Sequence, residues 1–335
     1  MTTELVSFGP ATEKWRTALS DSSRATYTPG IQKFQEYLAT QKLYPEIRSI
    51  HEFLKALLAE KASLENGEKD FLDQNFIDRD LMKGFGSFLL VDCKLKAKSC
   101  RTYIGAVQSL GAFWKIPIST AYAELPPAIE FYEKYQWSIE KVGEFIKSMA
   151  SPLYRCLGVW YIQTGLSNVD LLGQPPYDKH KGLRYGKIKE HLEAGVSPIC
   201  LNLVRAKTQR FEIKFRSFIG DLGIHYFKEY LSEHEPFKDE EKIFDVSGNA
   251  VEAYFGRRAQ AFIPNGYTNR NPACPSSLRT GFQTFLTDAK CDRSIIEYWM
   301  GHKLLGDLPK KYTNKSDDSW RATYREYEPA LTFKV

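Results

Sequence analysis

The stretch from Ser277 to Tyr312 decides how this sequence of 335 residues is interpreted. It reads S-L-R-T-G-F-Q-T-F-L, then I-I-E-Y-W-M-G-H, and ends in K-K-Y. Arg279 stands near the start of a predicted helix, His302 directly follows the next predicted helix, and Tyr312 comes ten residues later. An arginine, a histidine and a tyrosine in this order can converge on one phosphodiester, which the tyrosine would attack.

Helical spacing supports this reading of the stretch. A stripe of apolar residues at helical spacing is predicted to be buried: Leu278, Phe282, Phe285 and Leu286. Arg279 lies beside this stripe in the first turn of the predicted helix. A guanidinium there can bind a phosphate with two donors. Gly301 is a natural helix C-terminus that would hold His302 at a turn, where its imidazole can donate to a phosphate oxygen and steer a tyrosine hydroxyl. Each residue alone fits a structural role, so order and spacing carry the inference.

Residues 198–220 alternate apolar and polar side chains on both sides of A-K-T-Q-R. This pattern predicts a β-hairpin with one buried face. The apolar sets predicted to oppose each other are Ile199, Leu201 and Leu203 against Phe211, Ile213 and Phe215. Lys207 would top the hairpin and protonate a departing 5′-oxygen, and Arg205 and Arg210 would contact DNA. The alternative is a solvated basic hairpin.

The first third of the chain predicts four amphipathic helices over about residues 10–118, and Pro126-Pro127 is the best linker candidate. Within this region a basic group precedes and enters the fourth helix: Lys94, Lys96, Lys98 and Arg101. These side chains form either a solvated face or a surface that contacts DNA phosphates. Helical spacing resumes after residue 139, so the second part is mostly helical with a small antiparallel sheet.

Composition sets wider bounds. A net charge of +5 permits a nucleic-acid partner without demonstrating one. The six cysteines are scattered, without zinc or disulfide spacing, which indicates reduced thiols. The N-terminus lacks a signal-peptide pattern and no apolar run is long enough to span a bilayer. We therefore expect a cytoplasmic protein with no membrane contact.

Taken together, these sequence motifs resemble those of the tyrosine recombinase (phage integrase) family, and more closely those of its archaeal-type integrases. S-S-L-R resembles the family's H-x-L-R box, M-G-H resembles its glycine-histidine box, and Tyr312 stands where the nucleophile should be. R-A-K-T with S-F-I-G resembles the hairpin that carries the catalytic lysine. W-R-T-A-L-S-D-S-S-R-A-T-Y resembles the DNA-clamping N-terminal domain.

The resemblance implies a mainly α fold with a small antiparallel sheet. Its parts would be a helical core-binding (SAM-like) domain over 10–118, a catalytic domain over 128–312 and a C-terminal tail over 313–335 that docks on a neighbouring protomer. Tyr312 would form a 3′-phosphotyrosine and free a 5′-hydroxyl. Lys207 would be the general acid, and Arg279 and His302 would bind the non-bridging oxygens.

The implied function is site-specific recombination or integration of double-stranded DNA by a mobile-element enzyme. A homotetramer on DNA would exchange the strands. The covalent link stores the bond energy, so neither a metal nor another cofactor is required.

Two positions depart from the family's pattern. Ser167 follows T-G-L where the first catalytic arginine is expected, and Ser276 replaces the histidine of the H-x-L-R box. Ser276 would also serve as a helix N-cap. Three arginines are candidates for filling the gap: Arg155, Arg205 and Arg210. Two alternatives to the active recombinase stay open, a catalytically degenerate DNA-binding protein of the same fold and a relaxing type IB topoisomerase.

Overall fold

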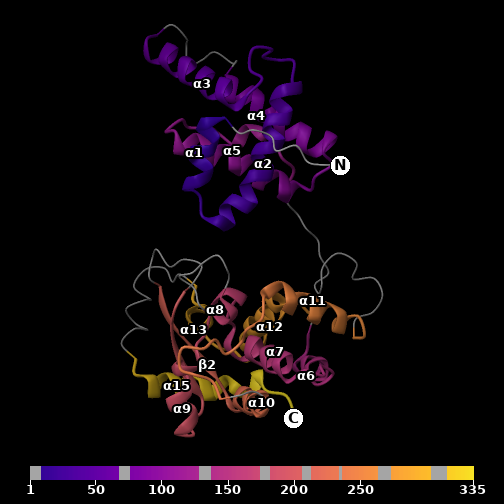
Figure 1. Cartoon of the computed structure of the whole chain (residues 1–335), viewed down its shortest axis with the longest axis vertical. Coiled ribbons are helices and arrows are strands. Elements are labelled where there is room, and N and C mark those ends of the chain that lie inside the picture. The colour runs from indigo at the N-terminus through magenta and orange to yellow at the C-terminus, as the bar shows by residue number, and fades with distance from the viewer. Residues whose placement is uncertain are drawn as a thin grey trace. The chain divides into compact units, whose positions relative to one another are not determined.

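The computed structural model of the chain describes residues 9–67, 76–127, 137–173, 182–205, 213–233, 236–262, 273–302 and 315–335. The chain divides into two compact units, residues 1–131 and 132–335 (Figure 1). Each unit has a hydrophobic core of its own. The described residues are mostly helical, with one two-stranded antiparallel sheet. The predicted fold class is confirmed.

The first unit contains α1 (Pro10–Ala18), α2 (Asp21–Thr40), α3 (Ile50–Glu65), α4 (Ile77–Ser87), the π-helical turn η1 (Phe88–Asp92), α5 (Ala97–Phe113) and the 3₁₀ turn η2 (Ala121–Ala123). The four predicted helices correspond to α2, α3, α4 and α5. Ser20 caps α2 by accepting from the Ser23 backbone N–H. The sequence did not predict α1, which is anchored by buried Trp15 through a 3.3 Å hydrogen bond from its Nε1 to Ser109 Oγ on α5.

The chain after α5 packs on the first unit. Ile116, Ile118 and Ala123 are buried in its core. Gly86 on α4 permits the approach of this segment, because a Cβ there would lie 2.3 Å from the Ala123 carbonyl oxygen. The predicted break in the helical pattern is therefore present, and the segment up to Ala123 belongs to the helical unit.

The second unit contains α6 (Ile139–Lys147), α7 (Pro152–Thr164), α8 (Asn168–Leu172), η3 (Tyr185–Lys187), α9 (Lys189–Glu193), β1 (Ile199–Val204), β2 (Lys214–Ile219), α10 (Asp221–Ser232), α11 (Gly248–Ala259), α12 (Pro275–Asp288), α13 (Arg293–Trp299), α15 (Asp317–Tyr327) and η5 (Glu328–Leu331). Helix α7 is central: ten of its thirteen residues are buried. It packs against α10 and α12. A helix that is apolar on all sides needs cover on all sides, and these neighbours provide it.

Strands β1 and β2 form the predicted hairpin with a different set of opposing residues. Ile199 lies opposite Ile219, Leu201 opposite Ser217 and Leu203 opposite Phe215. Phe215 lies opposite β1 as predicted, whereas the partners of Ile199 and Leu201 lie further along the chain than the predicted set. Phe211 lies outside the described residues. An even shift along a strand keeps the same face turned to the core, because side chains alternate with period two.

The C-terminal residues complete the core of the second unit. Trp320 and Tyr324 on α15 are buried, as are Leu331 and Phe333 beyond it. Trp320 stacks on Tyr298 of α13 with ring centroids 5.1 Å apart. The structure thus buries within its own unit the segment that the sequence analysis expected to dock on a neighbouring protomer.

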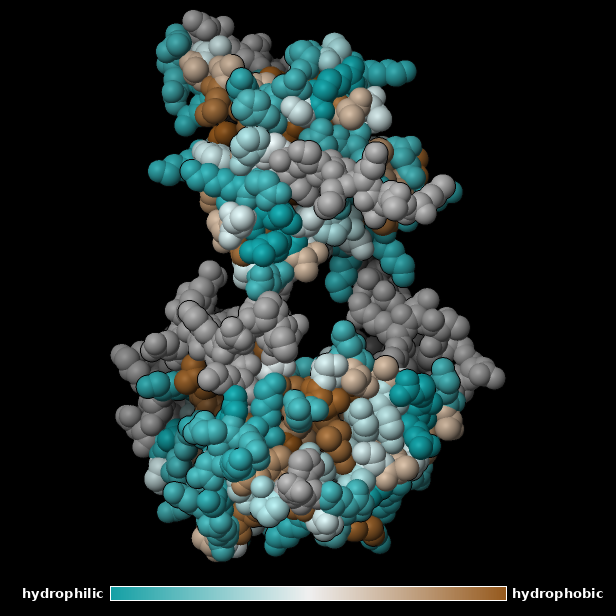
Figure 2. All heavy atoms as spheres, viewed as in Figure 1, coloured by the Kyte–Doolittle hydropathy of each residue, from teal (hydrophilic) through white to brown (hydrophobic). Residues whose placement is uncertain are grey.

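The visible surface of both units is mainly hydrophilic, with hydrophobic residues between (Figure 2). The large hydrophobic side chains exposed in the described ranges are scattered over both units: Leu43, Leu58, Val91, Phe113, Tyr122, Val204 and Val335. Among the helices described, none is both long and apolar enough to cross a bilayer.

Candidate active site

Helix α12 presents Arg279 from its second turn. Pro275 occupies its first position and Cys274 is the N-cap residue, which gives no side-chain cap hydrogen bond. The prediction that Ser276 caps this helix is therefore wrong, because the fixed φ of Pro275 already starts the helix before it. The predicted stripe is buried at Leu278, Phe282, Phe285 and Leu286. Arg279 beside the stripe is half-buried.

The Arg279 guanidinium binds the turn that follows α13. Its Nη2 donates to the Met300 carbonyl oxygen at 2.9 Å and lies 3.0 Å from His302 Nε2. Gly301 makes this turn possible, since its φ of +68° favours glycine. Arg279 and His302, 23 positions apart in sequence, are thus in direct contact.

The His302 ring is fixed from both sides. Its Nδ1 pairs with the Glu297 carboxylate, and its backbone N–H donates to the Glu297 carbonyl oxygen at 2.9 Å. A guanidinium has donors only, so Nε2 must accept from Arg279. The proton of the neutral ring therefore sits on Nδ1 and is donated to Glu297. Sequence reasoning missed Glu297, whose only signal was its place five residues before His302 in I-I-E-Y-W-M-G-H.

The charges around His302 favour this neutral form. Burial lowers the pKa of His302, and the positive charges of Arg279 and Arg205 lower it further. The hydrogen bond and the charge of Glu297 raise the pKa of His302 but do not cancel the other effects. The imidazole therefore offers a basic nitrogen toward Arg279 rather than a second N–H.

Arg205, expected as a DNA contact and as one candidate for the missing first arginine, lies at the same turn. It directly follows β1, and its Nη1 donates to the Gly301 carbonyl oxygen at 2.5 Å. Its charge acts on Arg279, where burial is the largest cause of a lowered pKa and Arg205 lowers the pKa further. Asp170 and Glu297 raise the pKa of Arg279. Two arginines, a neutral histidine and two acids are therefore grouped around residues 300–302.

Ser167, at the position expected for the first arginine, is the N-cap of α8. Its Oγ donates to the Asp170 carboxylate at 2.6 Å and accepts from the Asp170 backbone N–H at 3.4 Å. The Ser167 backbone N–H also donates to the Asp170 carboxylate at 3.3 Å, which completes a capping box. Ser276 is exposed, and its Oγ lies 3.0 Å from Cys274 Sγ. Both serines have local partners, which explains their presence without a role in phosphate binding.

The other expected site residues separate into two groups. Arg155 pairs with Glu229 at 2.5 Å and donates to the Met149 carbonyl oxygen at 2.6 Å, so its guanidinium is already engaged away from the turn. Tyr312, Lys207 and Arg210 lie outside the described residues. Their predicted roles stay predictions.

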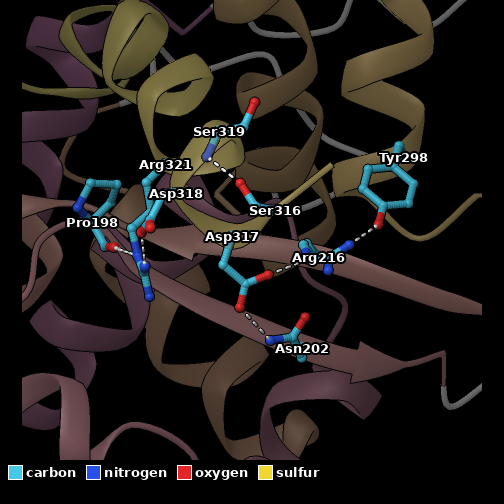
Figure 3. Close-up of polar contacts among 9 residues, drawn as sticks. All are labelled: Pro198, Asn202, Arg216, Tyr298, Ser316, Asp317, Asp318, Ser319 and Arg321. Atoms are coloured by element: carbon cyan, nitrogen blue, oxygen red, sulfur yellow. Dashed lines mark hydrogen bonds and ion pairs between the residues drawn. The ribbon is translucent and has the colours of Figure 1, made fainter. Parts of the chain in front are cut away.

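The start of α15, which follows Tyr312 in sequence, is anchored to the hairpin (Figure 3). Asp317 accepts from Arg216 Nε at 2.8 Å and from Asn202 Nδ2 at 3.2 Å, so it joins both strands. Arg216 also donates to the Tyr298 hydroxyl on α13 at 3.1 Å. In sequence, Tyr312 lies between His302 and Asp317, and both of these residues have hydrogen-bond partners within the second unit.

The basic group of the first unit lies around the N-terminus of α5. Lys94, Lys96, Lys98 and Arg101 are all exposed. Lys96 is the N-cap residue of the helix, and Lys94 has a φ of +52° at the bend between η1 and α5. Arg101 donates to the Pro126 carbonyl oxygen at 2.6 Å. A cluster of exposed cations at a helix N-terminus can accept phosphate groups.

Comparisons with known proteins identify the fold. No protein-family model and no curated protein sequence matches the chain. Among solved structures, the XerH site-specific recombinase bound to a palindromic difH substrate in a post-cleavage complex matches with a TM-score of 0.51 and 16% identity, over 92% of this chain and 80% of that chain.

The Tn1549 transposon integrase in complex with transposon right-end DNA matches with a TM-score of 0.51 and 14% identity, over 88% of this chain and 98% of that chain. The chain therefore has the fold of the tyrosine recombinases. Similarity at this level of identity identifies the fold only.

Proposed function

We propose that this chain is a site-specific DNA recombinase that cleaves and rejoins DNA through a 3′-phosphotyrosine on Tyr312. One observation carries the proposal: the Arg279 guanidinium is hydrogen-bonded to a neutral His302 at a fixed turn, ten residues before Tyr312. The tyrosine recombinase fold supports it.

In the proposed cleavage step, the Tyr312 oxygen bonds to phosphorus as the bond from phosphorus to the 5′-oxygen breaks. Neutral His302 accepts the phenol proton at Nε2 once Arg279 turns to the phosphate, and Glu297 pairs with the imidazolium that results. Lys207 gives a proton to the 5′-oxygen. Arg279 stabilises the negative charge that grows on the non-bridging oxygens. Rejoining reverses these steps, so no cofactor enters the balance.

The structure favours the role of proton acceptor for His302 over the role of phosphate donor that the family resemblance implied. An Nε2 that accepts from Arg279 in the free protein is poised to accept from a tyrosine hydroxyl. A donor role would need a second ring proton, which the two arginines oppose by lowering the pKa of His302.

The proposed partner is double-stranded DNA, held by a homotetramer during strand exchange. One structural neighbour named above is described in complex with transposon right-end DNA, and the other as bound to a palindromic difH substrate. The exposed group of Lys94, Lys96, Lys98 and Arg101 would contact phosphates. The integration reaction of a mobile element is the proposed context, of the archaeal type that the sequence resembles.

The test is capture of a covalent adduct. Duplexes with a randomised core and a nick near it are incubated with the protein, and species that survive SDS are isolated and sequenced. The proposal predicts an adduct that Tyr312→Phe abolishes and that the control Tyr327→Phe, a tyrosine on α15, retains. Salt-sensitive DNA binding without an adduct would instead establish the degenerate DNA-binding alternative, which the local engagement of Ser167 and Ser276 favours.

A further inference from the structure

The backbone of Arg205 is held in place by its pairing in the hairpin. Its backbone N–H donates to the Ile213 carbonyl oxygen at 2.9 Å, which continues the ladder of β1 and β2 by one residue. The neighbouring pair, Val204 and Lys214, is in register. Backbone pairing therefore fixes where the Arg205 side chain begins.

The hairpin also contacts the turn that holds His302. A Cβ on Gly301 would lie 3.0 Å from the Phe215 ring, so Phe215 of β2 packs directly against this turn. Arg205 and Arg279 then donate to consecutive carbonyl oxygens of the turn, those of Gly301 and Met300. The two guanidinium groups come from segments far apart in sequence and are attached to one short piece of backbone.

The two guanidinium groups at this turn supply donors that can bind an anion. Arg205 acts electrostatically on both Arg279 and His302. Two carboxylates also act on Arg279, and each hydrogen-bonds to a neutral group, Glu297 to His302 and Asp170 to Ser167. Two guanidinium groups held close together repel each other, and a group with two negatively charged oxygens would relieve this repulsion by accepting from both.

We propose that Arg205 is the second guanidinium on the scissile phosphate, and that it takes one non-bridging oxygen while Arg279 takes the other. This inference rests on the proposed function and assigns Arg205 to the reacting group rather than to DNA binding in general. It explains how the site tolerates Ser167: the hairpin supplies the charge that the start of α8 lacks. Arg205 would release the Gly301 carbonyl, or keep it with one of its five donors, as the phosphate arrives.

The test compares Arg205→Ala and Arg205→Lys with the control Lys214→Gln, which removes an exposed charge from the same hairpin. Single-turnover adduct formation is measured at saturating DNA, on the duplex captured with the wild type. Loss of one preorganised donor predicts a rate for Arg205→Ala that is about 10²–10³-fold below wild type. Lys214→Gln should stay within threefold, and Arg205→Lys should fall between.

A second substrate separates phosphate binding from damage to the fold. A methylphosphonate at the scissile position replaces one non-bridging oxygen by a methyl group and removes its charge. If Arg205 neutralises that oxygen, Arg205→Ala should cleave at least one methylphosphonate diastereomer within tenfold of wild type. A misfolded variant would be slow on every substrate.

The outcomes are distinguishable. An active wild type with Arg205→Ala within threefold of it overturns the inference and leaves the proposed function standing. An equal loss on the phosphodiester and on both methylphosphonates also overturns the inference, since Arg205 would then act only on structure. No adduct from the wild type overturns the proposed function, and the inference with it.

Discussion

Replacing Glu297 by glutamine tests the assigned state of His302 without any DNA. Glu297 is the source of both effects that raise the pKa of His302: its hydrogen bond to the ring and its negative charge. With the charge removed, burial and the two arginines act unopposed. The pKa of His302 should therefore fall in Glu297→Gln.

The magnitude follows from the contact. A hydrogen bond to a charged group contributes about 1.5–3 kcal/mol and a neutral one about 1 kcal/mol, so the change removes roughly 1 kcal/mol of preference for the protonated ring. At 1.36 kcal/mol per unit, the pKa should drop by about 0.7. The His302 side chain is 33% exposed and that of Glu297 is 23% exposed, so solvent screening keeps the drop from being much larger.

The assay is an NMR titration of the His302 ring in the wild type, in Glu297→Gln and in the control Glu190→Gln, an exposed residue on α9. The control should leave the pKa unchanged. A glutamine amide can also donate to Nδ1 and move the ring proton to Nε2, so the cleavage rate should fall by about 10²-fold or more as the base is lost. An unchanged or raised pKa in Glu297→Gln would refute the assignment.

The same pKa has a consequence for stability. The folded state lowers the pKa of His302 below 6.5, so it binds this proton less tightly than the unfolded state does. The contribution of neutral His302 to the free energy of unfolding is fully present above pH 6.5, and it is lost as the pH falls through the pKa of His302 in the folded state. Urea unfolding should therefore show that the His302→Gln variant loses less free energy of unfolding on acidification than the wild type does.

Three further predictions concern residues around the site. Ser167→Arg removes a helix cap, so the free energy of unfolding should fall by about 0.5–2 kcal/mol, while single-turnover cleavage should not rise because Arg205 already supplies the second guanidinium; a gain above tenfold contradicts this. Gly301→Ala should cost about 1–2 kcal/mol in urea unfolding, since alanine disfavours a φ of +68°; an equal stability would mean that the turn is not constrained. Trp320→Ala should cost about 3–5 kcal/mol, because its side chain is fully buried, whereas exposed Glu326→Ala on the same helix should stay within about 0.5 kcal/mol; equal effects would contradict the packing of α15 in its own unit.

Sequence periodicity predicted much of the fold because burial leaves a regular trace. Helices α2, α3, α4, α5, α7, α12 and α13 each carry apolar residues at helical spacing, and the hairpin alternates with period two. The opposing residues of the hairpin were predicted only in part, with Phe215 opposite Leu203, because any even shift of the register preserves that alternation. Helix α1 was missed because its attachment depends on one tryptophan that reaches α5.

The site was predicted in part for a similar reason. Arg279 and His302 could be found by their order along the chain, and the structure brings them into contact. Ser167 was interpreted as the replacement of an arginine, and its reciprocal hydrogen bonds with Asp170 are visible only in the folded structure. The location of Arg205 depends on how the hairpin packs against the turn at Gly301, which is a tertiary contact with no local signal.

The central claim is that Tyr312 attacks DNA, and one measurement tests it most directly. The protein is trapped on nicked duplex DNA, digested with protease and nuclease, and analysed by tandem mass spectrometry. The account predicts a nucleotide attached through its 3′-phosphate to the Tyr312 oxygen. A nucleotide on another residue, a 5′-linkage, or no linked nucleotide would contradict it.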